Sequence, residues 1–174
     1  MCLTPINLKD RSHPVPCGRC PECRKRRAAG WAFRLQQQLL DSITANFITL
    51  TYETAHVPIS NSKRLSLCKS HCQSFFKRLR EAHPVDYLRE TPIKYYLAGE
   101  YGTNTWRPHY HVILFNSKLE LIQPSWKYGQ IHYDTVNSAT IAYTLKYICK
   151  PKRVPQYQAD DRVPEFSLMS KNLA

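Results

Sequence analysis

The chain has 174 residues, a length that suits one domain with a sizeable hydrophobic core. Hydrophobic residues make up 43% and aromatic residues 11%, which excludes a disordered protein, and no apolar run is long enough to span a membrane. Lysine and arginine number 25 against 13 aspartates and glutamates, and the net charge of +12 favours nucleic acid as the partner over an anionic membrane surface.

The first residues lack the apolar block of a signal peptide, so we expect a chain that is not secreted and acts in the cytoplasm. The chain has seven cysteines, an odd number that cannot pair off completely. In a reducing compartment, clustered cysteines bind metal more often than they form disulfides. Residues 1–22 contain proline, cysteine and glycine with little periodicity, and we interpret them as a loop ordered by something other than a hydrophobic core.

Residues 23–42 predict a helix, because apolar residues recur at helical spacing on one side and polar residues occupy the other. The apolar side holds Ala28, Trp31, Ala32, Leu35 and Leu39, and the polar side holds Arg24, Lys25, Arg27, Arg34, Gln38 and Asp41. We interpret residues 1–45 as an N-terminal elaboration of a single domain that spans residues 1–174.

Residues 47–52 predict a strand, because they are mostly β-branched or aromatic. Its alternation places Ile48 and Leu50 on a buried face and Thr49 and Thr51 on the other. Residues 66–82 predict a second helix that ends before a proline. Its inward side holds Cys72, Phe75, Phe76 and Leu79, and its outward side holds Lys77, Arg78 and Arg80.

Residues 93–100 and 108–115 predict two strands joined by a short turn, and therefore a hairpin. A shorter strand at 129–136 and a helix at 138–150 follow, and the proline-containing tail at 151–174 has no clear period. This order of elements predicts an α+β fold, with a central antiparallel sheet of about five strands, helices packed on its faces and the active site on the open side. The buried stripe of the last helix holds Ile141, Leu145 and Ile148.

Two histidines separated by one tyrosine begin the second strand of the hairpin. Because side chains alternate along a strand, His109 and His111 share a face. If Glu100 pairs across from His109, its carboxylate joins both imidazoles, and this donor set suits Mg²⁺ or Mn²⁺ with positions left open for a phosphate. A register slip of one residue would turn Glu100 away, and the histidines would then be ordinary sheet residues.

Two tyrosines lie four residues apart on the last predicted helix, so Tyr143 and Tyr147 share one side of it. Lys146 and Lys150 lie beside them. One interpretation is a solvated aromatic and basic face. The other is nucleophilic catalysis, in which the lysines and a metal-bound phosphate favour the phenolate or stabilise the charge that develops.

Three cysteines precede the first helix at regular spacing. Cys17, Cys20 and Cys23 can supply three of the four ligands of a tetrahedral zinc site. The alternatives are free thiols or an iron–sulfur cluster, and His13 is one candidate for a fourth ligand. Three further residues, Cys68, His71 and Cys72, have helical spacing that could join a metal site, although Cys72 more simply packs in the core, and Cys149 is interpreted as a buried structural residue.

Basic residues recur in short runs, and the net charge favours their contact with a DNA backbone over a purely solvated role. Exposed aromatic residues could stack on the bases of a single strand. The candidate DNA-binding residues are Arg24, Lys25, Arg27, Lys77, Arg107 and Lys152, and the candidate stacking residues are Tyr52, Tyr96, Tyr101 and Trp106.

Three motifs in one order resemble a known family. The His109-Tyr110-His111 strand, the upstream strand at 47–52 and the Tyr143-x-x-Lys146-Tyr147-x-x-Lys150 helix together resemble the HUH endonucleases that start rolling-circle replication. More closely, the chain resembles the replication initiation proteins of microviruses of the gokushovirus type. Further stretches that carry the resemblance are residues 16–24, 99–102, 107–111 and 164–170, whereas residues 171–174 depart from the pattern.

The resemblance implies an N-terminal nuclease domain of a longer protein with an HUH, ferredoxin-like or RRM-like sheet. It implies metal-dependent nicking of single-stranded origin DNA or an origin hairpin by tyrosine, which leaves a 5′-phosphotyrosine and a free 3′-hydroxyl that can be rejoined without ATP. It also implies Cys2 as the fourth zinc ligand, the cytoplasm of a bacterial host as the location, and the host replication machinery as a partner.

Two other functions stay open from the sequence. The first is a non-catalytic, zinc-containing module that binds nucleic acid, and the second is a metal-dependent nuclease in which water attacks and no covalent intermediate forms. Neither predicts a protein–DNA adduct.

Overall fold

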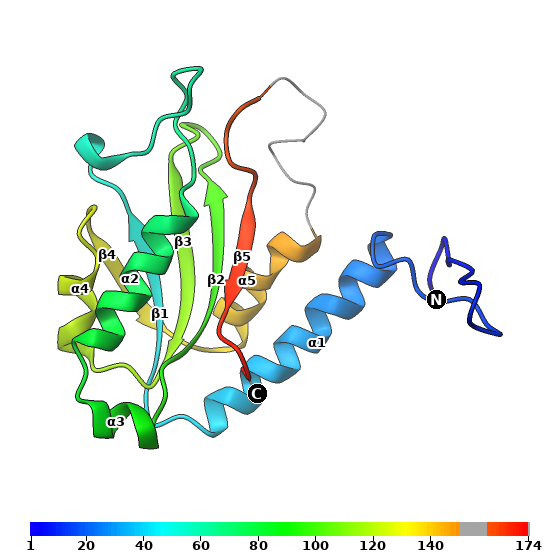
Figure 1. The fold of residues 1–174 in the computed structure, drawn as a ribbon, viewed down its shortest axis with the longest axis horizontal. Coiled ribbons are helices and arrows are strands. Elements are labelled where there is room, and N and C mark those ends of the chain that lie inside the picture. Colours follow the sequence, from blue (N-terminus) through cyan, green and yellow to red (C-terminus); the bar gives the residue numbers. More distant parts are fainter. Residues whose placement is uncertain (150–159, 174) are drawn as a thin grey trace.

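In the computed structural model, which describes residues 1–149 and 160–173, an antiparallel five-stranded sheet has helices on both faces (Figure 1). The order across the sheet is β4-β1-β3-β2-β5, so the predicted hairpin lies at its centre. The predicted α+β class is confirmed. The strands are β1 (Ala45–Thr51), β2 (Lys94–Tyr101), β3 (Pro108–Phe115), β4 (Ile131–Thr135) and β5 (Phe166–Met169).

The helices divide between the two faces of the sheet. The face that carries Ile48, Leu50 and Val112 packs against α2, and the face that carries Phe47 and Ile113 packs against α1 and α5. No helix in the described part of the chain is long and apolar enough to cross a membrane. The helices are α1 (Pro21–Leu40), α2 (Lys69–Glu81), α3 (Val85–Glu90), α4 (Ile122–Ser125) and α5 (Ser138–Cys149), with 3-10 turns η1 (Thr54–His56) and η2 (Leu119–Leu121).

The N-terminal elaboration extends beyond the sheet. Helix α1 begins at Pro21, two residues before the predicted start, because proline is tolerated in the first turn of a helix, where its missing N–H would have no partner. The cysteine-containing loop before α1 lies beyond the edge of the sheet (Figure 1). On the other end of α1, the prediction of Gln38 as an outward residue is wrong, because its side chain is buried and donates to Ser42 Oγ at 3.1 Å.

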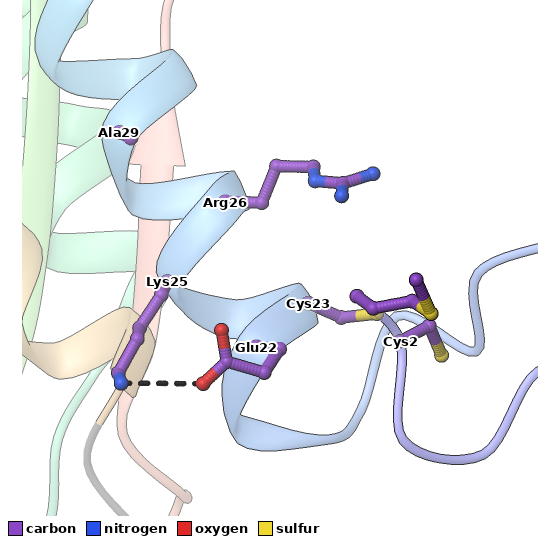
Figure 2. Close-up of a pocket in the computed structure, with 7 residues that line it drawn as sticks. Cys2, Glu22, Cys23, Lys25, Arg26 and Ala29 are labelled. Carbon is purple, nitrogen blue, oxygen red and sulfur yellow. Dashed lines mark hydrogen bonds and ion pairs between the residues drawn. The ribbon is translucent and has the colours of Figure 1, made fainter.

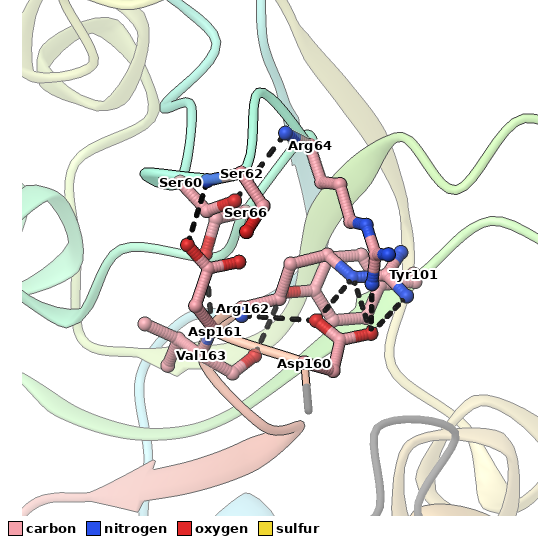
Figure 3. Close-up of polar contacts among 9 residues, drawn as sticks. All are labelled: Ser60, Ser62, Arg64, Ser66, Tyr101, Asp160, Asp161, Arg162 and Val163. Carbon is pink, nitrogen blue, oxygen red and sulfur yellow. Dashed lines mark hydrogen bonds and ion pairs between the residues drawn. The ribbon is translucent and has the colours of Figure 1, made fainter. Parts of the chain in front are cut away.

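The prediction of a tail at 151–174 without a regular element is wrong, because β5 pairs with β2 as an edge strand. Four residues are too few for alternation to be visible in the sequence. The chain before β5 is fixed by polar contacts with the loop at 60–66 (Figure 3). Asp160 accepts from Arg162 and Arg64, which hold the pKa of its carboxyl below the ordinary value, and the Ser62 N–H donates to Asp161 at 2.8 Å.

Three aromatic residues predicted as exposed base-stacking candidates are buried. Tyr52, Tyr96 and Tyr101 are at most 4% exposed, so this prediction is wrong. The hydroxyl groups of two of them find partners inside the protein, which offsets the cost of burying them: Tyr52 Oη lies 2.9 Å from Tyr110 Oη, and Tyr101 Oη donates to the Val163 carbonyl at 2.7 Å. The fourth candidate, Trp106, is half-buried, and the Arg162 guanidinium covers its ring at 4.1 Å from the centroid.

Candidate active site

The hairpin brings a carboxylate and two imidazoles to one point on the sheet face that α1 and α5 partly cover. Glu100 pairs with His109 and Ala98 with His111, so the predicted register is confirmed. The Nε2 atoms of His109 and His111 lie 2.8 and 2.7 Å from the same oxygen, Oε1 of Glu100. All three side chains offer ligand atoms within 4.8 Å of one another, the geometry of a metal-binding group.

The hydrogen bonds behind the imidazoles indicate what this cluster holds. His109 Nδ1 lies 3.2 Å from the Arg107 carbonyl, which only accepts, so this nitrogen carries the proton. In the neutral ring, Nε2 then directs a lone pair at a carboxylate oxygen, an arrangement that an extra proton or a cation must relieve. His111 is oriented in the same way by Thr49, whose Oγ1 lies 3.0 Å from Nδ1. Two imidazoles and one carboxylate, with both rings oriented from behind, are a donor set that fits a divalent cation.

Burial strengthens the electrostatics of the cluster. Glu100 is 5% exposed and His111 is 7% exposed. Burial alone would raise the pKa of Glu100, but the hydrogen bonds from His109 and His111 outweigh it and lower that pKa to about 2. The carboxylate is therefore ionised at neutral pH and is available as a ligand.

A groove of about 430 Å³ opens next to this cluster. Its floor is β1, where Thr49 and Thr51 are the half-exposed residues, and its walls come from β3, β4, α5 and the hairpin turn. The groove is lined by Thr49, Thr51, Tyr52, Gly102, Thr105, Arg107, Pro108, His109, His111, His132 and Tyr143.

The structure separates the two candidate tyrosines. The Tyr143 ring lies edge-on to His111, with centroids 5.0 Å apart, and its side chain is 42% exposed in the groove. Tyr147 contacts the Tyr143 ring at 6.3 Å but is not among the described residues that line the groove. The prediction that the tyrosine helix packs beside the metal-binding cluster is thus met by Tyr143.

Lys146 lies between the two rings. Its Nζ is 3.2 Å from the centroid of Tyr143 and 4.9 Å from that of Tyr147. Burial lowers the pKa of the Lys146 ammonium, against the opposing attraction of Glu100. The predicted residues Lys150 and Lys152 lie outside the described residues.

Four cysteines meet at the start of α1. The Sγ atoms of Cys2 and Cys20 are 3.9 Å apart and those of Cys17 and Cys23 are 4.0 Å apart, and all four lie within 4.8 Å of one another. Zn–S bonds of about 2.3 Å in a tetrahedron require sulfur separations of about 3.8 Å, so the four sulfurs fit zinc. The alternative ligand His13 bonds to Ser12 instead and is not part of the group.

The loop between the first two cysteines of the motif favours thiolates. Gly18 has φ +72°, a conformation that other residues rarely adopt, and it turns the backbone N–H groups of Arg19 and Cys20 toward Cys17 Sγ at 3.4 and 3.3 Å. With the Thr4 hydroxyl, which contributes most, these donors lower the pKa of Cys17 to about 5.

The other cysteines do not form a metal group in the described part of the chain. Cys72 is buried in the core under α2, and its Sγ donates to the Cys68 carbonyl. Cys149, predicted as buried, is exposed, because it lies at the end of α5 beyond the last residue that packs on the sheet.

The candidate DNA-binding residues occupy three places. Arg107 lines the groove, and its guanidinium donates to the Tyr52 carbonyl at 2.5 Å. Lys77 lies on α2, which covers the opposite face, and pairs with Glu81 at 3.8 Å. The residues Arg24, Lys25 and Arg27 lie in the first turns of α1 next to the cysteine group.

The space beside the cysteine group is itself basic. Figure 2 shows Lys25 and Arg26 on the first turns of α1, near Cys2 and Cys23, with Lys25 paired to Glu22 at 3.2 Å. These residues line a pocket of about 300 Å³.

Sequence reasoning missed two residues of the groove. The strand pattern places Thr49 on the correct face but does not identify it as the partner of His111, and nothing in the pattern singles out His132. The register supplies the missing signal, because Thr49 pairs with His111 on one side and with His132 on the other.

Comparison with known proteins gives a consistent set of matches. A family model described as a replication-associated protein of the ORF2 type matches residues 45–152. The chain is 31% identical over 179 residues to replication-associated protein ORF2 of Spiroplasma virus 4, covering 91% of this chain and 55% of the relative. It is 30% identical to replication-associated protein VP4 of Bdellovibrio phage phiMH2K, covering 83% and 51%.

A third relative is replication-associated protein ORF4 of Chlamydia phage 1, which is 28% identical over 82% of this chain and 40% of its own length. The chain thus spans about half the length of the curated relatives it matches. No solved structure matches it.

Proposed function

The chain belongs to the family of ORF2-type replication-associated proteins, and from this premise we propose that it initiates replication by cutting single-stranded origin DNA with a tyrosine nucleophile. The matches to phage replication proteins confirm the resemblance that the motifs indicated. The observation that carries the proposed chemistry is the groove in which Tyr143 lies beside the Glu100–His109–His111 cluster.

In the proposed reaction, the Tyr143 phenol attacks the phosphorus of the scissile phosphodiester. The product is a 5′-phosphotyrosine and a free 3′-hydroxyl, and the retained phosphodiester energy allows the strands to be rejoined without ATP. Glu100, His109 and His111 would hold Mn²⁺ or Mg²⁺, which when bound would withdraw charge from the phosphate. Lys146, over the Tyr143 ring, favours the phenolate by its charge.

Tyr143 is the tyrosine for the first cut, because Tyr147 does not line the groove in the described part of the chain. Tyr147 remains close enough, at 6.3 Å between centroids, to take part in a second cut after a movement of α5. Lys146 contacts both rings and can therefore serve either tyrosine. Lys150 is proposed as a further basic group of the same helix.

The substrate proposed is single-stranded DNA or an origin hairpin. Arg107 in the groove and the basic first turns of α1 would bind its phosphates. Lys77 and Lys152 remain proposed contacts, Lys77 on the opposite face of the sheet. As the replication protein of a phage, the chain would act in the bacterial cytoplasm with the host replication machinery, and residues 1–174 would form one nuclease domain.

We propose zinc for the four-cysteine group. Replacement of Cys20 by serine is expected to remove one zinc ion per chain and to expose residues 1–20, so that trypsin cleaves after Arg11 at least about tenfold faster. Elemental analysis and timed proteolysis measure both effects. The matched control is Cys149→Ser, an exposed cysteine outside the group, which leaves zinc content and cleavage unchanged. A purified protein without zinc, or with zinc retained in Cys20→Ser, contradicts the assignment.

One denaturing gel separates the three candidate functions. A randomised pool of single-stranded oligonucleotides labelled at the 3′ end is incubated with the protein and Mn²⁺. The proposed function predicts label that migrates with the protein and is released by protease, and sequencing of that DNA gives the nick site. A water nuclease gives shortened DNA without adduct, and a binding module gives neither, so either pattern would refute the proposal.

A further inference from the structure

His132 lies at the edge of the groove on the same face as the metal-binding cluster. Strand pairing places it in one row across the sheet, His132 on β4, Thr49 on β1 and His111 on β3. It is exposed, and it lines the groove together with Tyr143. Two strand spacings separate the ends of this row, which puts His132 about 10 Å from His111 along the sheet.

The chain has seven histidines, and His132 differs from the other six. Among the described residues it has no hydrogen bond, ion pair or ring contact, whereas each of the others has a polar partner within the protein. The partners are Ser12 for His13, Glu53 for His56, Tyr52 for His71, Leu79 and Lys118 for His83, and Glu100 for His109 and His111. The ring of His132 therefore lines the groove with both nitrogens available to a substrate.

The position of His132 relative to the nucleophile points to its role. Tyr143 contacts His111 at one end of the row, and His132 stands at the other end, with Thr49 on the floor between them. In a displacement at phosphorus, the leaving oxygen departs on the side opposite the nucleophile. For a phosphodiester lying over Thr49, the leaving 3′-oxygen is thus directed toward β4.

We propose that His132 is the general acid that protonates the leaving 3′-oxygen, an inference that rests on the proposed function. As the bond from Tyr143 Oη to phosphorus forms, the bond from phosphorus to O3′ breaks and its electron pair goes to O3′. The imidazolium of His132 gives its proton to that oxygen and becomes neutral, and the phenolic proton of Tyr143 passes to solvent. In the rejoining reaction the neutral imidazole takes the proton back from the 3′-hydroxyl, so His132 serves both directions.

A bridging-sulfur substrate tests this role, because a thiolate leaves without being protonated. The oligonucleotide carries the nick-site sequence with either oxygen or sulfur at the scissile 3′ position, and single-turnover cleavage is measured in saturating Mn²⁺. His132→Ala is expected to slow cleavage of the oxygen substrate by about a hundredfold or more and that of the sulfur substrate by less than about threefold. His132→Gln, which keeps a hydrogen bond but cannot donate an acidic proton, is expected to behave like His132→Ala.

His56→Ala is the matched control, since His56 is similarly exposed but lies in η1 outside the groove, and it should cut both substrates at the wild-type rate. Equal slowing of both substrates by His132→Ala would show a positioning role, and no slowing would show no role; either overturns the inference while the proposed function stands. If the wild type forms no adduct with either substrate, the proposed function itself fails.

Discussion

Replacing Tyr143 with phenylalanine is expected to reduce formation of the covalent protein–DNA adduct by more than about a thousandfold, because no other described hydroxyl group on α5 lies in the groove. The change removes one oxygen atom from a side chain that is 42% exposed, so the fold and the metal-binding cluster should persist. The rate of adduct formation on a labelled oligonucleotide in Mn²⁺ measures the effect.

Tyr147→Phe is the matched control for this experiment. It removes the same atom from the same helix, four residues away, and should leave the first cut within about threefold of the wild-type rate. It should, however, impair a second cut or transfer between two strands. An adduct that survives in Tyr143→Phe but is lost in Tyr147→Phe would reverse the assignment, and an adduct in the double variant would remove tyrosine from the mechanism.

The double replacement of His109 and His111 by alanine is expected to abolish cleavage, by more than about a thousandfold, while leaving the binding of single-stranded DNA within about threefold. The two rings supply two of the three ligands of the cluster, yet their side chains are only 22% and 9% exposed, so they offer a DNA strand little surface. Cleavage kinetics and a fluorescence binding titration measure the two quantities.

A readout that does not depend on cleavage completes this test. Mn²⁺ bound to the protein, followed by electron paramagnetic resonance, should be lost in the double variant and kept in His132→Ala, which lies outside the ligand set. Cleavage that persists in the double variant, or Mn²⁺ affinity that does not change, would show that the cluster is not the catalytic metal site.

The central part of the fold could be predicted from the sequence because both of its signals are local. A turn of a few residues joins the two strands of the hairpin, so the register follows from placing polar His109 opposite Glu100, and the structure has this pairing. The cysteine group was also predictable, since three of its four members lie within seven residues and the fourth was implied by resemblance.

Features that depend on long-range pairing were not predictable in this way. Strand β5 is four residues long and forms only because β2 offers an open edge. The short helices α3 and α4, of six and four residues, carry no complete amphipathic period. The burial of Tyr52 and Tyr101 follows from partners far away in the sequence, Tyr110 and Val163, which no local pattern reveals.

The contribution of His132 belongs to the same class. Its place in the groove depends on β4 pairing with β1, a contact between segments about 80 residues apart in the sequence. The composition of a single strand gives no sign of it, and only the assembled sheet places the His132, Thr49 and His111 row under one substrate-sized groove.

The most direct test of the account is the position of the DNA on the protein. Trypsin cleaves after Lys127 and Lys146 but not before Pro151, so it places Tyr143 and Tyr147 on different peptides, residues 128–146 and 147–152. After reaction in Mn²⁺, mass spectrometry of the digested adduct should find the nucleotide on peptide 128–146, with fragment ions that assign it to Tyr143. Cleaved DNA with no modified peptide, or with the nucleotide on a residue outside α5, would contradict the claim that this groove cuts DNA by tyrosine attack.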